Sequence, residues 1–221
     1  MAEVQQGIFE FRGVDGLVYA EVLTDNEGSD GYTTGEVKSL SMVAEIGKTT
    51  ETASEAKYYD NVAMLVINSE GADTFTLQVA PVNLEVLSEI TGKNFDAETG
   101  AMIDAERKVK YFAIGYRTKG TDGEYRYVWR YKGTFNIPDE TIASENAGTD
   151  SNNQELTYTG IYTTHKFVKG GSAKAIVVDT RYDKADLTKF FDTVTTPDTL
   201  KAKTPPSPPQ ESSVEPKTIK K

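Results

Sequence analysis

The order of hydrophobic and polar residues along the chain predicts a protein built mainly from β-strands. The segment TFTLQV alternates, so that Phe75, Leu77 and Val79 share one face. The segment VAMLVI (62–67) is apolar throughout, which predicts a strand buried on both faces. Further strands are expected at 17–23, 37–46, 109–117, 124–135, 155–167 and 173–179.

A change of period after the alternating segment predicts a helix. In VNLEVLSEITG, Leu84, Leu87 and Ile90 fall on one helical stripe. Asn83 can cap the start of this helix and Gly92 can end it. A second, short helix is expected near the end of the chain, where apolar residues recur at helical spacing: Leu187, Phe190, Phe191 and Val194.

The most distinctive stretch is GEYRYVWRYKGTF, which the turn signal Asp122–Gly123 joins to the preceding strand as a hairpin. In an extended strand its aromatic side chains point one way and are predicted to be core: Tyr125, Tyr127, Trp129, Tyr131 and Phe135. The basic side chains Arg126, Arg130 and Lys132 point the other way, toward solvent or a partner. Because rings and basic groups lie on opposite faces of an acidic protein, a platform for single-stranded nucleic acid is disfavoured.

Long polar segments separate the predicted strands, at 24–36, 47–60, 93–108 and 136–154. Loops longer than about 12 residues are uncommon in a compact domain unless they have a function. We therefore interpret these segments as arms that become ordered against partners. The fold class is predicted as mainly β, a β-sandwich or small barrel with one flanking α-helix.

The composition divides the chain into three parts. Residues 1–15 are expected to form an N-terminal arm, and residues 16–194 a single β domain. Six of the eight prolines lie after Val194, so 195–221 is predicted to be a disordered, Pro-rich tail that serves as a spacer.

The chain of 221 residues has no cysteine, no apolar run long enough to span a membrane, and no basic start followed by an apolar leader. We expect a soluble protein made in a reducing cytoplasm, without a membrane partner. The net charge is −10 and is unevenly spread, because residues 1–100 carry 18 acidic and 5 basic side chains. This balance disfavours binding to nucleic-acid phosphates, which requires a basic surface.

The sequence offers no convincing catalytic or metal site. Gly47–Lys48–Thr49 resembles the end of a phosphate-binding loop, but Met42 stands where the motif requires glycine. The acidic loop at 25–36 has Asp30 where a calcium-binding loop requires glycine. His165 is the sole histidine, so no second imidazole is present to share a zinc ion. We therefore expect no enzyme activity, no metal and no cofactor.

The hairpin GYRTKGTDGEYRYVWRYKGTF, followed by IPDET and later by QELTYTGIY, resembles the major tail proteins of long-tailed phages (siphophages) of Gram-positive hosts. The segments at 16–25, 32–46 and 58–61 and the predicted helix are also similar to that family. The likeness covers about residues 16–164. Family members often have two aliphatic residues after the tryptophan, where this chain has Arg130 and Tyr131, and the Pro-rich end is not a fixed family feature.

The resemblance implies a tail-tube subunit whose copies form hexameric rings that stack into a hollow tube for DNA ejection. It implies a location in the virion tail, and in the host cytoplasm before assembly. The expected partners are other copies of the chain and other tail proteins, namely the terminator, tape-measure and distal tail proteins. DNA would pass without specific binding, along a lumen that tends to be acidic in this family, because like charge keeps the duplex moving.

The resemblance also suggests which residues make contacts between subunits. The segment 47–61 is the first candidate for an arm between rings, with these residues: Lys48, Glu51, Glu55, Lys57, Tyr58 and Tyr59. Arg126, Arg130 and Lys132 are candidates for contact with an acidic neighbour. The alternative function is a carbohydrate- or protein-binding β-sandwich module, which would present exposed aromatic ring faces. A hydrolase is disfavoured, because the sequence lacks a nucleophile elbow and histidine partners.

Overall fold

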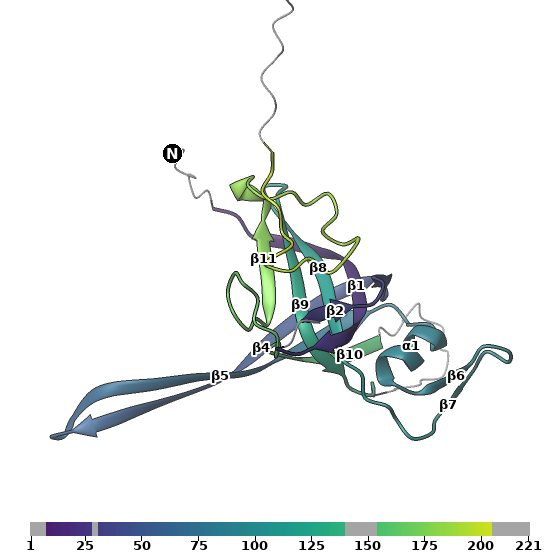
Figure 1. Cartoon of the computed structure of the whole chain (residues 1–221), viewed down its shortest axis with the longest axis horizontal. Helices are drawn as coiled ribbons and strands as arrows, with labels where there is room; N and C mark the ends of the chain where they lie inside the picture. The colour runs from purple at the N-terminus through teal and green to yellow at the C-terminus, as the bar shows by residue number, and fades with distance from the viewer. Residues whose placement is uncertain (1–7, 28–30, 140–153, 205–221) are drawn as a thin grey trace, which may run out of the picture.

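A large antiparallel sheet forms the centre of the computed structural model, which describes residues 8–27, 31–139 and 154–204 (Figure 1). The strands are β1 (Phe11–Asp25), β2 (Tyr32–Thr34), β3 (Lys38–Ser39), β4 (Val43–Tyr59), β5 (Val62–Val79), β6 (Asn94–Asp96), β7 (Ala101–Ile103), β8 (Phe112–Gly120), β9 (Tyr125–Phe135), β10 (Gln154–Ile161) and β11 (Ala175–Asp179). One α-helix, α1 (Leu84–Thr91), and a 3-10 turn, η1 (Thr180–Tyr182), complete the described part. The predicted mainly β fold with one flanking helix is confirmed.

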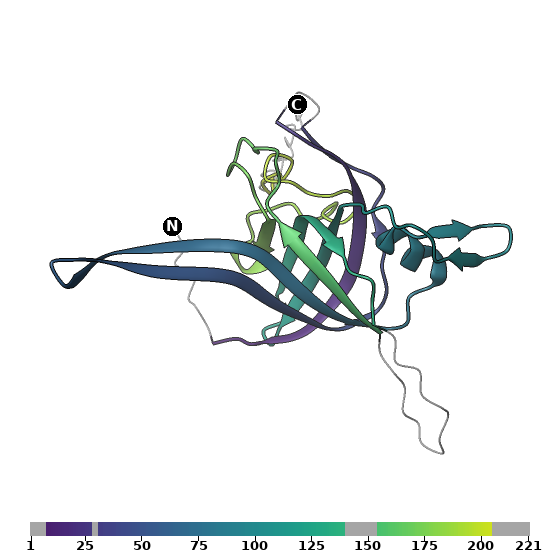
Figure 2. The same ribbon diagram turned by 90° about the horizontal axis from the view of Figure 1, so that it is seen from below.

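The strand order of the sheet is β2-β1-β8-β9-β10-β5-β4, and β11 pairs with β9. Strand β9 lies at its centre, because its first half pairs with β8 and β11 and its second half with β8 and β10. The small hairpin β6–β7 lies beside α1, at one end of the molecule (Figures 1 and 2).

Both faces of the central strands are buried, because successive side chains enter two separate hydrophobic clusters. On one face, Ile114 and Val128 join the cluster that α1 covers with Leu87 and Ile90. On the other face, Trp129 joins the cluster that the C-terminal segment covers. A strand covered on both faces and paired along both edges is the most firmly held position in a sheet.

The helix α1 lies where the sequence predicts it. The Asn83 side chain accepts a hydrogen bond from Val86 N at 2.8 Å, as a helix N-cap does. Gly92 ends the helix with φ of 72°, and a Cβ there would lie 1.9 Å from Lys108 O, so only glycine fits. The buried face of α1 is narrower than predicted, because Leu87 and Ile90 are buried but Leu84 is exposed.

The C-terminal segment corrects two expectations. Residues 187–194 form successive turns and not a helix, although Phe190 and Val194 are buried as predicted. The described chain also continues past the boundary at 195 that the composition predicts. The Tyr131 hydroxyl donates to Thr195 O at 3.1 Å, and Asp186 N donates to Lys201 O at 3.0 Å. The Pro-rich stretch at 205–221 lies outside the described residues.

The N-terminal boundary also moves outward, so the folded domain is longer than predicted at both ends. Strand β1 begins at Phe11, inside the segment expected to be an N-terminal arm, and Phe11 pairs with Gly120, the last residue of β8. Of the long polar segments, 24–36, 47–60 and 93–108 contain strands, while 140–153 of the last one lies outside the described residues.

Candidate functional site

The described residues contain no cluster of three or more His, Cys, Asp or Glu side chains that could hold a metal ion. Over the same residues, no helix is long and apolar enough to cross a membrane. His165 makes contacts within the fold. Its backbone N donates to Asp25 Oδ1 at 2.8 Å, and its ring packs edge-on against Phe167. The candidate functional site of this protein is therefore an exposed surface.

The most unusual surface is the hairpin of β4 and β5, whose outer part leaves the sheet and projects away from the rest of the chain (Figures 1 and 2). We call residues 52–70 the arm; their register runs from Thr52 opposite Glu70 to Tyr59 opposite Val62. The tip is a two-residue turn at Asp60 and Asn61, with φ of 50° and 65°. Positive φ at both central positions is typical of a tight β-hairpin turn.

Large hydrophobic side chains of the arm are exposed, with exposed fractions between 49% and 70%. These residues are Tyr58, Tyr59, Val62, Met64, Leu65, Val66 and Ile67. The sequence predicts that 62–67 is buried on both faces, and this prediction is wrong. A continuous apolar run predicts a strand that needs covering, but no described element of this chain covers it.

The pairing shows that both faces of the arm are apolar. Residues directly opposite each other share a face, and successive pairs alternate. Tyr59 pairs with Val62, and Lys57 pairs with Leu65 on the same side. Tyr58 pairs with Ala63 on the other side, and Ala56 with Val66. Because an isolated two-stranded hairpin is at best marginally stable in water, this arm is suited to burial against a partner.

The predicted arm residues occupy different levels of the hairpin. Lys48 lies at its root, with Nζ 3.3 Å from Asp73 Oδ2. Glu55 and Lys57 form an ion pair partway along, and Tyr58 and Tyr59 lie at the tip. Glu51 is exposed where the arm leaves the sheet. The sequence predicts the strand at 62–67 but not its pairing with 47–59, although Asp60–Asn61 directly between the two runs is a turn signal that indicates a hairpin.

The three basic residues of β9 do not form an exposed stripe, which corrects the expectation that they face solvent; their contact with another subunit stays a prediction. Arg126 Nη2 lies 3.1 Å from Asp179 Oδ2 and its guanidinium lies over the Phe11 ring. The side chains of Arg130 and Lys132 are only 14% and 12% exposed. Arg130 pairs with Asp73 and Lys132 pairs with Asp25, so each charge has a partner in its own chain. Period-two alternation predicts the side of a strand but not what lies on that side.

Trp129, Tyr131 and Phe135 of β9 are core as predicted, but they divide between two clusters; Tyr125 belongs to neither cluster. Trp129 donates from Nε1 to Phe190 O at 2.8 Å, and Tyr131 lies in the same cluster. Burial raises the pKa of the Tyr131 hydroxyl. Phe135 lies in the opposite cluster, against Phe112. The reason is a register shift between β8 and β9. From Arg130 to Gly133 the strand β9 advances by three residues, whereas β8 advances by two, from Ile114 to Phe112. The extra residue of β9 reverses which side chains point to which face, so Phe135 points to the face opposite Tyr131.

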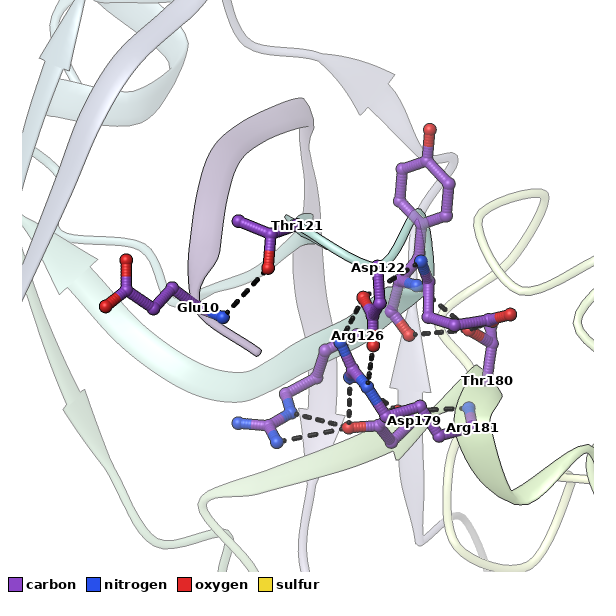
Figure 3. A network of polar contacts seen from close by, with 9 residues as sticks. Glu10, Thr121, Asp122, Arg126, Asp179, Thr180 and Arg181 are labelled. Carbon is purple, nitrogen blue, oxygen red and sulfur yellow. Dashed lines mark hydrogen bonds and ion pairs between the residues drawn. The ribbon is translucent and has the colours of Figure 1, made fainter. Parts of the chain in front are cut away.

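Tyr125 and Tyr127 are half-buried at the start of β9, where a polar network ties the strand to the C-terminal segment (Figure 3). Arg181 donates to Asp122 Oδ2 at 2.7 Å and to Asp179 Oδ1 at 2.9 Å. Burial opposes ionisation of Asp179, but hydrogen bonds from Arg181 and Arg126 outweigh it and lower its pKa.

Comparisons with known proteins do not identify a family, since no protein-family model and no curated protein sequence matches this chain. The resemblance to phage tail proteins therefore stays a prediction drawn from the residues themselves.

Proposed function

We propose that this protein is a non-enzymatic structural subunit of a phage tail tube, which assembles through its arm into stacked, hexameric rings. The observation that carries the proposal is the arm itself, a projecting hairpin with apolar residues on both faces. Exposed apolar patches of this kind are typical of protein interfaces. The partner in this proposal is another copy of the chain, and the location is the virion tail.

The contrast between the arm and the central strand β9 supports this assignment over a binding module. A carbohydrate site would use exposed ring faces, but Trp129 and Tyr131 of the aromatic strand are fully buried. The exposed ring faces of Tyr111 and Tyr162 have lysine ammonium groups above them, at 4.9 and 4.7 Å from their centroids. Exposed apolar side chains elsewhere on the described residues are scattered along the chain, whereas those of the arm form one group, at Tyr58, Tyr59, Val62 and 64–67.

A double substitution on one face of the arm tests the proposal. Leu65→Ser with Ile67→Ser removes exposed side chains that make no contribution to either hydrophobic cluster. We expect a folded chain that stays monomeric at concentrations where the unmodified chain assembles, measured by light scattering after size-exclusion chromatography. The matched control is Val177→Ser with Tyr182→Ser, which removes side chains of similar exposure from the body and should leave assembly unchanged.

The opposite pattern would contradict the proposal. If the arm variant assembles normally and the body variant does not, the interface lies on the body. If the unmodified chain stays strictly monomeric at high concentration and binds a glycan array, the protein is a binding module and not a tube subunit.

A further inference from the structure

The root of the arm is bent by a β-bulge. Thr50 pairs with Asp73, and Thr52 pairs with Glu70. Between these pairs β4 supplies one residue and β5 supplies two, which is the geometry that bends a strand and increases its twist. One of the two is Gly71, where a Cβ would lie 2.6 Å from a carboxylate oxygen of Glu51. The bulge therefore marks the point where the arm turns away from the sheet.

A buried carboxylate lies beside this bulge. Asp73 is 2% exposed, and three cations from three parts of the chain surround it. Lys48 Nζ on β4 lies 3.3 Å away, Arg130 Nη1 on β9 lies 3.5 Å away, and Lys174 Nζ lies 3.4 Å away. The Thr50 hydroxyl donates to Oδ1 at 2.8 Å. One side chain thus joins both strands of the arm to the central strand of the sheet.

Lys174 holds the outer side of the same bulge. Its Nζ donates to Glu70 Oε1 at 2.7 Å and to Gly71 O at 2.5 Å, and its side chain is 8% exposed. The bulge is therefore fixed on both sides, by Asp73 toward the sheet and by Lys174 toward the arm. The buried charge of Arg130 is balanced mainly by Asp73. Its Nε is buried without a hydrogen-bond partner, and its guanidinium lies over the Phe75 ring.

The balance of charge makes the carboxylate indispensable to this arrangement. Among the described residues, the carboxylates that form ion pairs with Lys48, Arg130 and Lys174 are Asp73 and the half-exposed Glu70. Removing the Asp73 charge leaves three cations close together with one exposed carboxylate, and partly buried charges without partners are strongly unfavourable. Lys48 is 37% exposed and can turn to solvent, whereas Arg130 and Lys174 are 14% and 8% exposed and reach solvent by movement of the chain around them. Movement of Lys174 releases its contacts with Glu70 and Gly71 at the root of the arm.

We propose that Asp73 is a positioning residue that fixes the direction of the arm relative to the sheet. The biological consequence rests on the proposed function, since an arm with a preset direction loses less conformational freedom when it reaches a neighbouring copy. The positioning itself is a property of the single chain and can be measured without assembly.

Distance measurement by pulsed electron spin resonance tests this inference, because the chain has no cysteine and accepts spin labels at chosen sites. One label is placed at the arm tip by Tyr59→Cys and the other on β11 by Val177→Cys, both at exposed positions. Dilute, monomeric protein should give one narrow distance distribution. In the Asp73→Asn background we expect a distribution at least about twofold broader, because the unpaired cations release the root.

Two further variants keep the test decisive. Lys174→Met leaves Asp73 paired with Lys48 and Arg130, and should broaden the distribution less; it also decides the question if Asp73→Asn does not fold. The matched control is Glu55→Gln, which breaks the ion pair with Lys57 within the arm and should leave the distribution unchanged.

A narrow, unchanged distance distribution in folded Asp73→Asn would overturn the inference. If Asp73→Asn does not fold, an unchanged distance distribution in Lys174→Met would overturn it. The two proposals fail separately. If distances depend on Asp73 but the unmodified chain forms no rings or tubes, the positioning role stands and the tail-tube function is refuted.

Discussion

Two hairpins of this protein have similar pairing and opposite surroundings. The β8–β9 hairpin and the β4–β5 arm are both long antiparallel ladders with tight turns and several large apolar side chains. In the first, Trp129 is fully buried, because side chains cover both faces and strands pair on both edges. In the second, Leu65 and Val66 are about half exposed, because the described chain covers neither face. Apolar strands therefore mark both where this domain is held together and where a partner can bind.

The largest effect on stability is expected at the centre of the sheet. Trp129→Ala should reduce the free energy of unfolding by about 3–5 kcal/mol, because it leaves a large cavity and removes the hydrogen bond to Phe190 O. Urea unfolding followed by circular dichroism measures the change. The matched substitution Tyr59→Ala, at a residue 60% exposed on the arm tip, should change stability by less than about 0.5 kcal/mol. Equal losses at the two sites would mean that the arm is part of the folded core.

A smaller effect is expected at Asp25, which joins β1 to the loop after β10. It accepts hydrogen bonds from Thr164 N at 2.9 Å and His165 N at 2.8 Å, and it pairs with Lys132. Burial opposes ionisation of Asp25, but these hydrogen bonds outweigh it and lower its pKa. Asp25→Asn should reduce stability at neutral pH by about 1–3 kcal/mol.

The pH dependence follows from the sign of that shift. A carboxyl group with a lowered pKa in the folded state stabilises the protein above its unfolded pKa of about 4, and this contribution is lost as the pH falls through the folded pKa. The difference between the unmodified chain and Asp25→Asn should therefore be constant near pH 7 and shrink below about pH 4. Urea unfolding at several pH values measures it, and a difference that grows on acidification would contradict the assignment.

The smallest effect on stability is expected along the arm. Ile67→Ser should leave the midpoint of thermal unfolding unchanged within about 1 °C, because the exposed side chain supports no cluster. The same substitution should weaken self-association measured by sedimentation. A lowered midpoint in the dilute monomer would show that the arm contributes to the fold of its own chain.

Local signals in the sequence predicted local structure well. Asn83 and Gly92 mark the ends of α1, and Asp122–Gly123 marks the β8–β9 turn, because caps and tight turns depend on a few adjacent residues. Phe75, Leu77 and Val79 are buried as their alternation predicts.

Features that depend on distant contacts were not predictable in the same way. The face occupied by Phe135 depends on a register shift against β8, and the burial of Arg130 depends on Asp73 two strands away. The run 62–67 is exposed because no other described element packs on either face of the arm. Residues 187–194 have helical spacing but form turns, whose Phe190 carbonyl accepts a hydrogen bond from Trp129. In the candidate site, the sequence predicted Tyr58, Tyr59 and the strand at 62–67, but not that 47–59 is itself a strand and pairs with it.

Electron microscopy of the purified full-length chain at high concentration tests the central claim most directly. The tail-tube account predicts hollow rings or stacked tubes with six-fold symmetry, in which density for the arm of one copy lies against a neighbouring copy. A field of single particles of monomer size, or an assembly in which the arms project freely into solvent, would contradict it.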